Sequence, residues 1–124
     1  MTIQLTRREL DVISVVWELG SATVGEVLEK LGENLAYTTV LTVLRTLETK
    51  GAVRHEKEGK AYRYYARVES EHVGDWSINR LLDKVYQGSR EMLIARLVED
   101  EDLSPQELKR IRRLLDRRLK EMDA

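Results

Sequence analysis

The sequence has no cysteine, one proline and no long apolar run. Without cysteine there can be no disulfide, no thiolate metal site and no cysteine nucleophile. No apolar segment approaches the roughly 20 residues that a membrane-spanning helix needs. The chain also does not begin with the basic stretch, apolar segment and small-residue cleavage site of an export signal. We therefore expect a cytoplasmic protein.

Histidine is scarce as well, which argues against catalysis. The only two histidines are His55 and His72, and neither lies at metal-ligand or catalytic-triad spacing from other polar residues. The 124 residues allow one domain, or a small module with an appended arm, rather than a large enzyme with an internal cavity. We expect no enzymatic activity, no metal site and no cofactor.

The net charge of -1 conceals an uneven distribution along the chain. Residues 1–35 carry three basic and six acidic side chains, residues 36–67 seven and three, and residues 68–124 eleven and thirteen. A local basic segment is typical of a surface that binds phosphate, although a solvated charged surface would give the same imbalance.

Three helices are predicted in the N-terminal half. Each of the first two begins with a capping box, a threonine followed three residues later by glutamate, and the third ends at Gly51 in a C-cap position. Apolar residues recur at helical spacing within each. The predicted helices span about residues 7–19, 24–31 and 37–50.

A β-hairpin follows, with strands at residues 53–57 and 61–66 and a turn at Gly59. Three helices and a hairpin make a winged helix-turn-helix, so the predicted fold class is mainly α with a small β-hairpin wing. An unrelated small α+β domain with no role in nucleic-acid binding is the alternative.

The C-terminal part is predicted to be helical. One helix extends to Gly88, a second covers residues 92–98, and a third begins after Ser104 as N-cap with Pro105 at its first position. Amphipathic helices appended to a complete small domain must bury their apolar faces. Packing against a second copy of the chain is the simplest way to bury these faces. The alternative is that the helices fold back onto the N-terminal domain. We expect residues 1–68 to bind DNA and residues 69–124 to dimerise through Trp76, Leu81, Leu93, Leu97, Leu108, Ile111, Leu115 and Leu119.

The third helix has the pattern of a DNA-recognition helix. Thr38, Thr42, Arg45 and Thr49 form a polar stripe opposite apolar residues, and Thr39 and Thr46 flank it. Short polar side chains let a helix approach the major groove while hydroxyls and long basic groups reach bases and phosphates. An ordinary solvated face is the alternative, but such faces favour Glu, Lys and Gln.

Basic residues also mark the hairpin. Lys57 and Lys60 at its tip are candidates for phosphate contacts, which position a protein without reading sequence. Strand alternation places Tyr62 and Tyr64 on one face and Arg63 with Tyr65 on the other. One set of tyrosines can therefore pack against the core while the basic set follows the DNA backbone.

Two long segments resemble the BlaI/MecI/CopY family of penicillinase-type repressors: LTRRELDVISVVWELGSATVGEVLEKL and LAYTTVLTVLRTLETKGAVRHEKEGKAYRYYARV. The later KVYQGS and VEDEDLS are also similar. The resemblance implies a homodimer that binds a palindromic operator. By position, Tyr37, Thr38, Thr39 and Thr42 would lie at or in the major groove, and the wing from Lys57 to Arg63 would lie on the flanking backbone. The predicted DNA-binding residues are Tyr37, Thr38, Thr39, Thr42, Arg45, Thr46, Thr49, Lys57, Lys60 and Arg63.

Three departures from the family pattern bear on mechanism. The metal-binding cysteines of copper-responsive relatives are absent, which excludes release by copper. The Asn-Phe bond that is cut to inactivate the β-lactam-responsive repressors aligns with Arg96–Leu97, which casts doubt on cleavage there. Thr46 stands where many relatives have arginine, and Arg45 points about 100° away around the helix, so operator preference should differ.

The resulting hypothesis is a repressor of nearby genes, with antibiotic-resistance or stress genes and its own operon as candidate targets. A membrane sensor-protease of the same system is a candidate partner. The competing hypothesis is a winged helix that binds protein instead of DNA.

Overall fold

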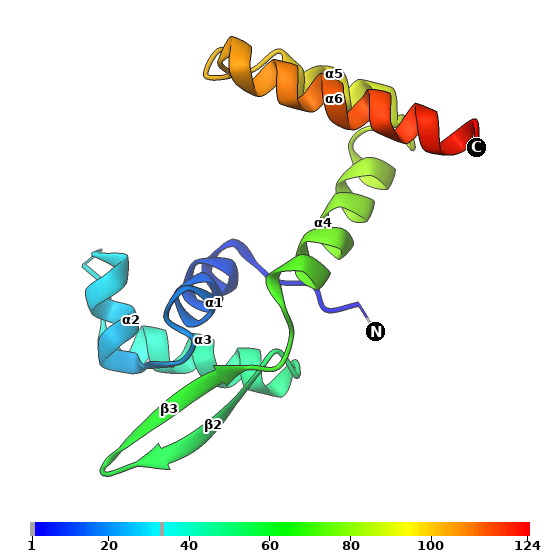
Figure 1. Ribbon diagram of the computed structural model, residues 1–124. Helices are drawn as coiled ribbons and strands as arrows, with labels where there is room; N and C mark the ends of the chain where they lie inside the picture. The colour runs from blue at the N-terminus through cyan, green and yellow to red at the C-terminus, as the bar shows by residue number, and fades with distance from the viewer. Residues whose placement is uncertain (1, 33) are drawn as a thin grey trace. The chain divides into compact units, whose positions relative to one another are not determined.

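A computed structural model describes residues 2–32 and 34–124. These residues form two compact units, 1–79 and 80–124, with α4 contributing to both. In chain order the elements are α1 Arg7–Leu19, β1 Ala22–Thr23, α2 Val24–Leu31, α3 Tyr37–Thr49, β2 Val53–Glu58, β3 Ala61–Ala66, α4 Ser70–Lys84, α5 Arg90–Val98 and α6 Pro105–Met122 (Figure 1). The mainly helical prediction with a small β wing is confirmed.

The N-terminal unit is a winged helix whose core lies between α1, α2, α3 and the sheet (Figure 1). The apolar stripe of each helix faces this core, and Tyr64 is the largest side chain buried in it. The core residues are Val12, Ile13, Val15, Val16, Ala22, Val24, Val27, Val40, Leu44, Leu47, Ala52, Val53 and Tyr64. Their helical and strand spacing explains why these segments fold as they do.

The predicted capping boxes are present. The Thr6 and Thr23 hydroxyls accept the backbone N–H groups of Glu9 and Glu26, and each glutamate in turn accepts the backbone N–H of its threonine. These reciprocal bonds satisfy two otherwise unpaired donors at each helix start. The boundaries of α1 and α2 therefore follow from the sequence.

The structure adds one strand to the predicted hairpin. β1 pairs antiparallel with β3, which gives a three-stranded sheet in the order β1–β3–β2. β1 contains only Ala22 and Thr23, too few residues to show the alternation that identifies a strand in a sequence. The wing is thereby attached to the start of α2.

In the C-terminal unit, α4 ends at Lys84, before the predicted end at Gly88. Gln87 and Gly88 have φ angles of 52° and 82°, which an α-helix does not allow. Ser89 and Ser104 cap α5 and α6. No helix in the described part of the chain is both long and apolar enough to cross a lipid bilayer.

Candidate nucleic-acid interface

The two faces of α3 differ sharply. Val40, Leu44 and Leu47 are buried in the core at 1%, 0% and 0% exposure. All of the α3 residues predicted to meet DNA are exposed: Tyr37, Thr38, Thr39, Thr42, Arg45, Thr46 and Thr49. The core thus orients α3 so that its threonine face is open to a ligand.

The threonine hydroxyls of this face bind their own helix. The hydroxyl of Thr42 donates to the Thr38 carbonyl at 2.8 Å, and Thr46 and Thr49 make the equivalent bonds at 3.0 Å to the residue four positions earlier. Because its hydrogen is already donated, each hydroxyl can only accept hydrogen bonds from a ligand. The threonine methyl group lies beside it. The surface can therefore contact a thymine methyl group or accept from a base amine.

The start of α3 differs from the starts of α1, α2, α5 and α6. Thr6, Thr23, Ser89 and Ser104 cap α1, α2, α5 and α6 with their side chains. The N-cap residue of α3 is Ala36, which makes no side-chain cap bond. Free backbone N–H groups at a helix start attract phosphate. Sequence analysis missed this feature, and the signal was an alanine where a capping residue is usual.

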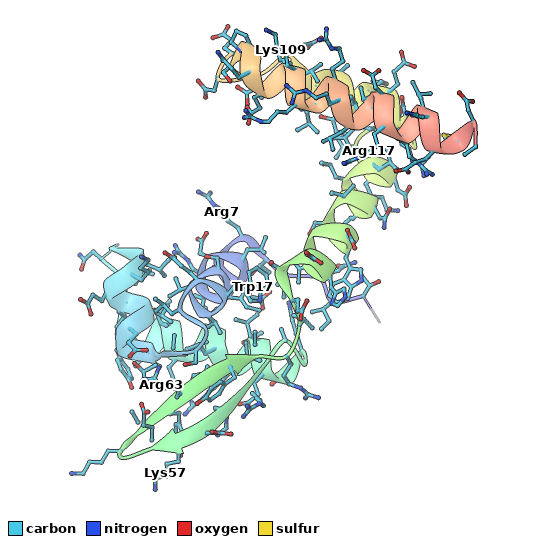
Figure 2. All side chains as sticks on the ribbon, viewed as in Figure 1. Arg7, Trp17, Lys57, Arg63, Lys109 and Arg117 are labelled. Atoms are coloured by element: carbon cyan, nitrogen blue, oxygen red, sulfur yellow. The ribbon has the colours of Figure 1, made fainter. Side chains whose placement is uncertain are left out.

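The wing presents Lys57 and Lys60 near its tip. Both are exposed, and Lys57 points away from the rest of the N-terminal unit at the far end of the hairpin (Figure 2). Arg54, by contrast, stacks on the Tyr65 ring at 4.4 Å and forms an ion pair with Glu56 at 2.7 Å. The tip lysines are the wing residues best placed for phosphate.

Arg63, one of the predicted DNA contacts, is engaged in ion pairs within the protein. Its guanidinium binds both carboxylate oxygens of Glu26, at 2.8 and 3.1 Å, and pairs with Glu58 at 2.9 Å. Hydrogen bonds to Glu26 and then to Glu58 raise the pKa of Arg63 above its ordinary value. The same contact, followed by the N–H of Thr23, lowers the pKa of Glu26.

The alternation of the hairpin tyrosines is as predicted. Tyr64 is buried at 2% exposure, whereas Tyr62 on the same face lies further out and is 45% exposed. His55 contacts both rings and also lies 2.7 Å from the Glu48 carboxylate. Because Glu48 belongs to α3, this pair links the wing to α3.

The end of α3 is tied to the start of α1 by an ion pair. The Lys50 ammonium donates to Glu9 at 2.7 Å and to the Gln4 carbonyl at 2.9 Å, and Glu9 is only 4% exposed. Burial alone would raise the pKa of Glu9, but hydrogen bonds from Lys50 and the Thr6 N–H outweigh it, and the pKa lies below 4.5. The pair helps to hold α3 against the core.

Replacing Glu9 by glutamine should destabilise the protein by about 1.5–3 kcal/mol at neutral pH. A folded-state pKa below the unfolded one means that the carboxylate stabilises the fold above about pH 4.5 and that this stabilisation fades as the pH falls through the folded pKa. The gap between wild type and variant in urea unfolding should therefore shrink towards pH 3. Glu29→Gln, at an exposed site on α2, is the control. A gap independent of pH would contradict the assigned role of the carboxylate.

Most of the predicted dimerisation residues are apolar side chains that the single chain leaves exposed. Leu81, Leu97, Leu108, Leu115 and Leu119 are exposed, and Trp76, Leu93 and Ile111 are partly buried. Neither α5 nor α6 contains a buried residue. Further exposed apolar residues on the C-terminal unit, outside the predicted set, are Val85, Met92, Ile94, Val98, Leu114 and Met122.

The Arg96–Leu97 bond lies inside α5, and both side chains are exposed. Its peptide groups are held in a helix, so a protease would need α5 to unfold locally before cutting there. Together with the replacement of Asn-Phe, this position gives no support to cleavage at that bond.

Comparisons with known proteins agree with this geometry. The family model described as Penicillinase repressor matches residues 5–117. The methicillin resistance regulatory protein MecI of Mammaliicoccus sciuri is 26% identical over 119 residues, covering 94% of this chain and 97% of that protein. The penicillinase repressor of Bacillus licheniformis is 26% identical over 115 residues, covering 91% and 90%.

A solved structure is similar to the N-terminal part. The DNA-binding domain of the repressor BlaI is 30% identical with a TM-score of 0.52, covering 58% of this chain and 90% of that domain. The family match spans most of the chain, and the structural match spans the winged helix. The chain belongs to the penicillinase repressor family, whose members are winged-helix transcriptional repressors that bind DNA and are not enzymes.

Proposed function

We propose that this protein is a homodimeric repressor that binds a palindromic operator with α3 in the major groove. The observation that carries the proposal is the exposed threonine face of α3, directed outward by a core of Val40, Leu44 and Leu47. Tyr37, Thr38, Thr39 and Thr42 would meet base edges, and Arg45, Thr46 and Thr49 would complete the contact along the helix.

Phosphate contacts would position α3 on the duplex. The uncapped start of α3 offers backbone N–H groups to one phosphate, and Lys57 and Lys60 on the wing offer ammonium groups to the flanking backbone. These contacts are independent of sequence. They would give the protein a general affinity for DNA on which base contacts impose selectivity.

Dimerisation would bury the apolar surface of the C-terminal unit, mainly at residues 69–124. Most of the stability of a protein helix comes from packing of its apolar face, and α5 and α6 bury no residue in the single chain. Patches of this extent are rare on monomeric proteins and mark interaction sites. A second copy is the occupant that the family resemblance favours, and residues 1–68 of each copy would then serve one operator half-site.

Repression would follow from occlusion. Two α3 helices held about one duplex turn apart enter successive major grooves, so a promoter beneath them is closed to polymerase. The cytoplasm is the proposed site of action, and resistance or stress genes and the protein's own operon are the proposed targets. A membrane sensor-protease of the same system is the proposed partner.

Mobility shifts with duplexes from upstream of the protein's own gene and its neighbours test this function. Because each neutralised phosphate releases counterions, affinity for the operator should fall at least tenfold, and by as much as about 10³-fold or more, between 50 and 200 mM salt. A scrambled duplex of equal length is the control. Weak, unselective binding to every duplex would instead favour a winged helix that binds protein.

A further inference from the structure

The wing has a defined point at which it leaves the sheet. β1 pairs with β3 only at Ala22–Tyr64 and Thr23–Arg63. Beyond Arg63, towards the turn, β2 and β3 continue as two strands alone. An isolated two-stranded hairpin is marginally stable in water. Without further support, the tip that bears Lys57 and Lys60 would adopt many positions relative to α2 and α3.

Arg63 provides support at this point. Its Nη1 donates to Glu26 at 2.8 Å and lies 3.4 Å from the Ser21 hydroxyl. Its Nη2 donates to the other Glu26 oxygen, and its Nε donates to Glu58 at 3.1 Å. Figure 2 shows the side chain on β3 beside α2. One guanidinium thus joins the start of α2 to the strand end next to the turn.

The contact with Glu26 is also linked to the capping of α2. Glu26 is the acid of the capping box, and the oxygen that accepts the Thr23 N–H also accepts from Arg63. Paired bonds from an arginine fork to one carboxylate are strong and fix an orientation. The Arg63 side chain is 21% exposed, and each of its three nitrogens already has a carboxylate partner. A DNA phosphate would therefore have to compete with these partners for the guanidinium.

We propose that Arg63 is a positioning residue, which fixes the wing tip against α2 and acts on DNA through Lys57 and Lys60 without contacting it. The inference rests on the proposed function for its effect on operator binding, but the fixing of the tip is a property of the free protein. The inference gives Arg63, which the sequence predicted to contact DNA, a role within the protein instead.

Arg63→Lys tests the inference, because it keeps the charge and loses the fork. In the free protein, amide hydrogen exchange of residues 57–62 should become several-fold faster, while exchange in α1 and α3 and the thermal midpoint stay unchanged. Arg54→Lys, a matched change on β2, should leave exchange in the tip as it is. Unchanged exchange in Arg63→Lys would overturn the inference, whether or not the protein binds an operator.

A double-mutant cycle tests the effect on DNA. Arg63→Lys should weaken operator binding about fivefold in the wild-type background and less than about twofold in a Lys57→Ala/Lys60→Ala background, because it acts through those lysines. Equal losses in both backgrounds would mean that Arg63 contacts DNA itself, which overturns the inference. If the wild type binds no operator, the proposed function fails, and the exchange experiment still decides the role of Arg63.

Discussion

Replacing Leu115 by aspartate should turn the protein into a monomer and lower its operator affinity at least about 100-fold. Leu115 is 49% exposed in the single chain, on the same face of α6 as Leu108 and Leu119. In the proposed dimer this face is buried, so two unpaired carboxylates would have to be desolvated. A monomer can occupy only one half-site, so it loses the affinity that comes from binding two linked half-sites at once. Sedimentation equilibrium and mobility shifts measure the two effects.

Gln106→Asp is the matched control for this variant. It adds the same charge to α6 nine positions earlier, which is about half a turn around the axis, on the face opposite Leu115. It should leave both mass and affinity unchanged. A Leu115→Asp protein that is still dimeric would place the dimer interface elsewhere. A monomeric variant that binds the operator as tightly as wild type would contradict the need for two half-sites.

The helix boundaries of the N-terminal unit could be predicted because their signals are local. Thr6 with Glu9 and Thr23 with Glu26 lie three residues apart, and each pair is present as a capping box. The buried and exposed faces of α3 likewise follow from spacing within one helix. Such features need no knowledge of how distant segments meet, and they were enough to predict a winged helix.

The ion pair of Arg63 with Glu26 could not be predicted, because the two residues lie 37 positions apart in the sequence. The sequence shows a basic residue in a basic hairpin, and only the fold brings β3 against the start of α2. The two-residue strand β1 could not be predicted for a related reason. It is defined by its pairing with β3, and two residues show no alternation of their own. The ion pair of Glu9 with Lys50, 41 residues apart, is a third case.

The apolar surface of the C-terminal unit could be predicted only in part. Helical spacing predicted the amphipathic faces of α5 and α6, and the structure adds that neither helix has a buried residue. Spacing could not reveal how little of this surface the chain covers by itself. That depends on which segments the fold brings against each helix, which spacing within one helix does not show.

Thr42→Ala should reduce affinity for the operator at least about 30-fold and leave affinity for a scrambled duplex unchanged. Losing the recognition of one base pair costs about 1–3 kcal/mol, and in a dimer the contact is lost twice, which amounts to about 2–6 kcal/mol. Thr42 is exposed in the middle of the predicted contact face, so no core packing is lost. Competition mobility shifts with operator and scrambled duplexes measure the ratio. Equal losses on both duplexes would show that Thr42 does not read bases.

Serine and valine at the same position separate the two chemical groups of Thr42. Its hydroxyl hydrogen is bound to the Thr38 carbonyl, so towards DNA the side chain offers a methyl group and acceptor lone pairs. We expect the methyl group to make the contact. The operator affinity of Thr42→Val should then lie within about tenfold of the wild-type affinity, and that of Thr42→Ser should be nearly as low as that of Thr42→Ala. That result would place a thymine methyl group beneath Thr42. The reverse order would assign the contact to the hydroxyl oxygen, and hence to an adenine or cytosine amine in the half-site.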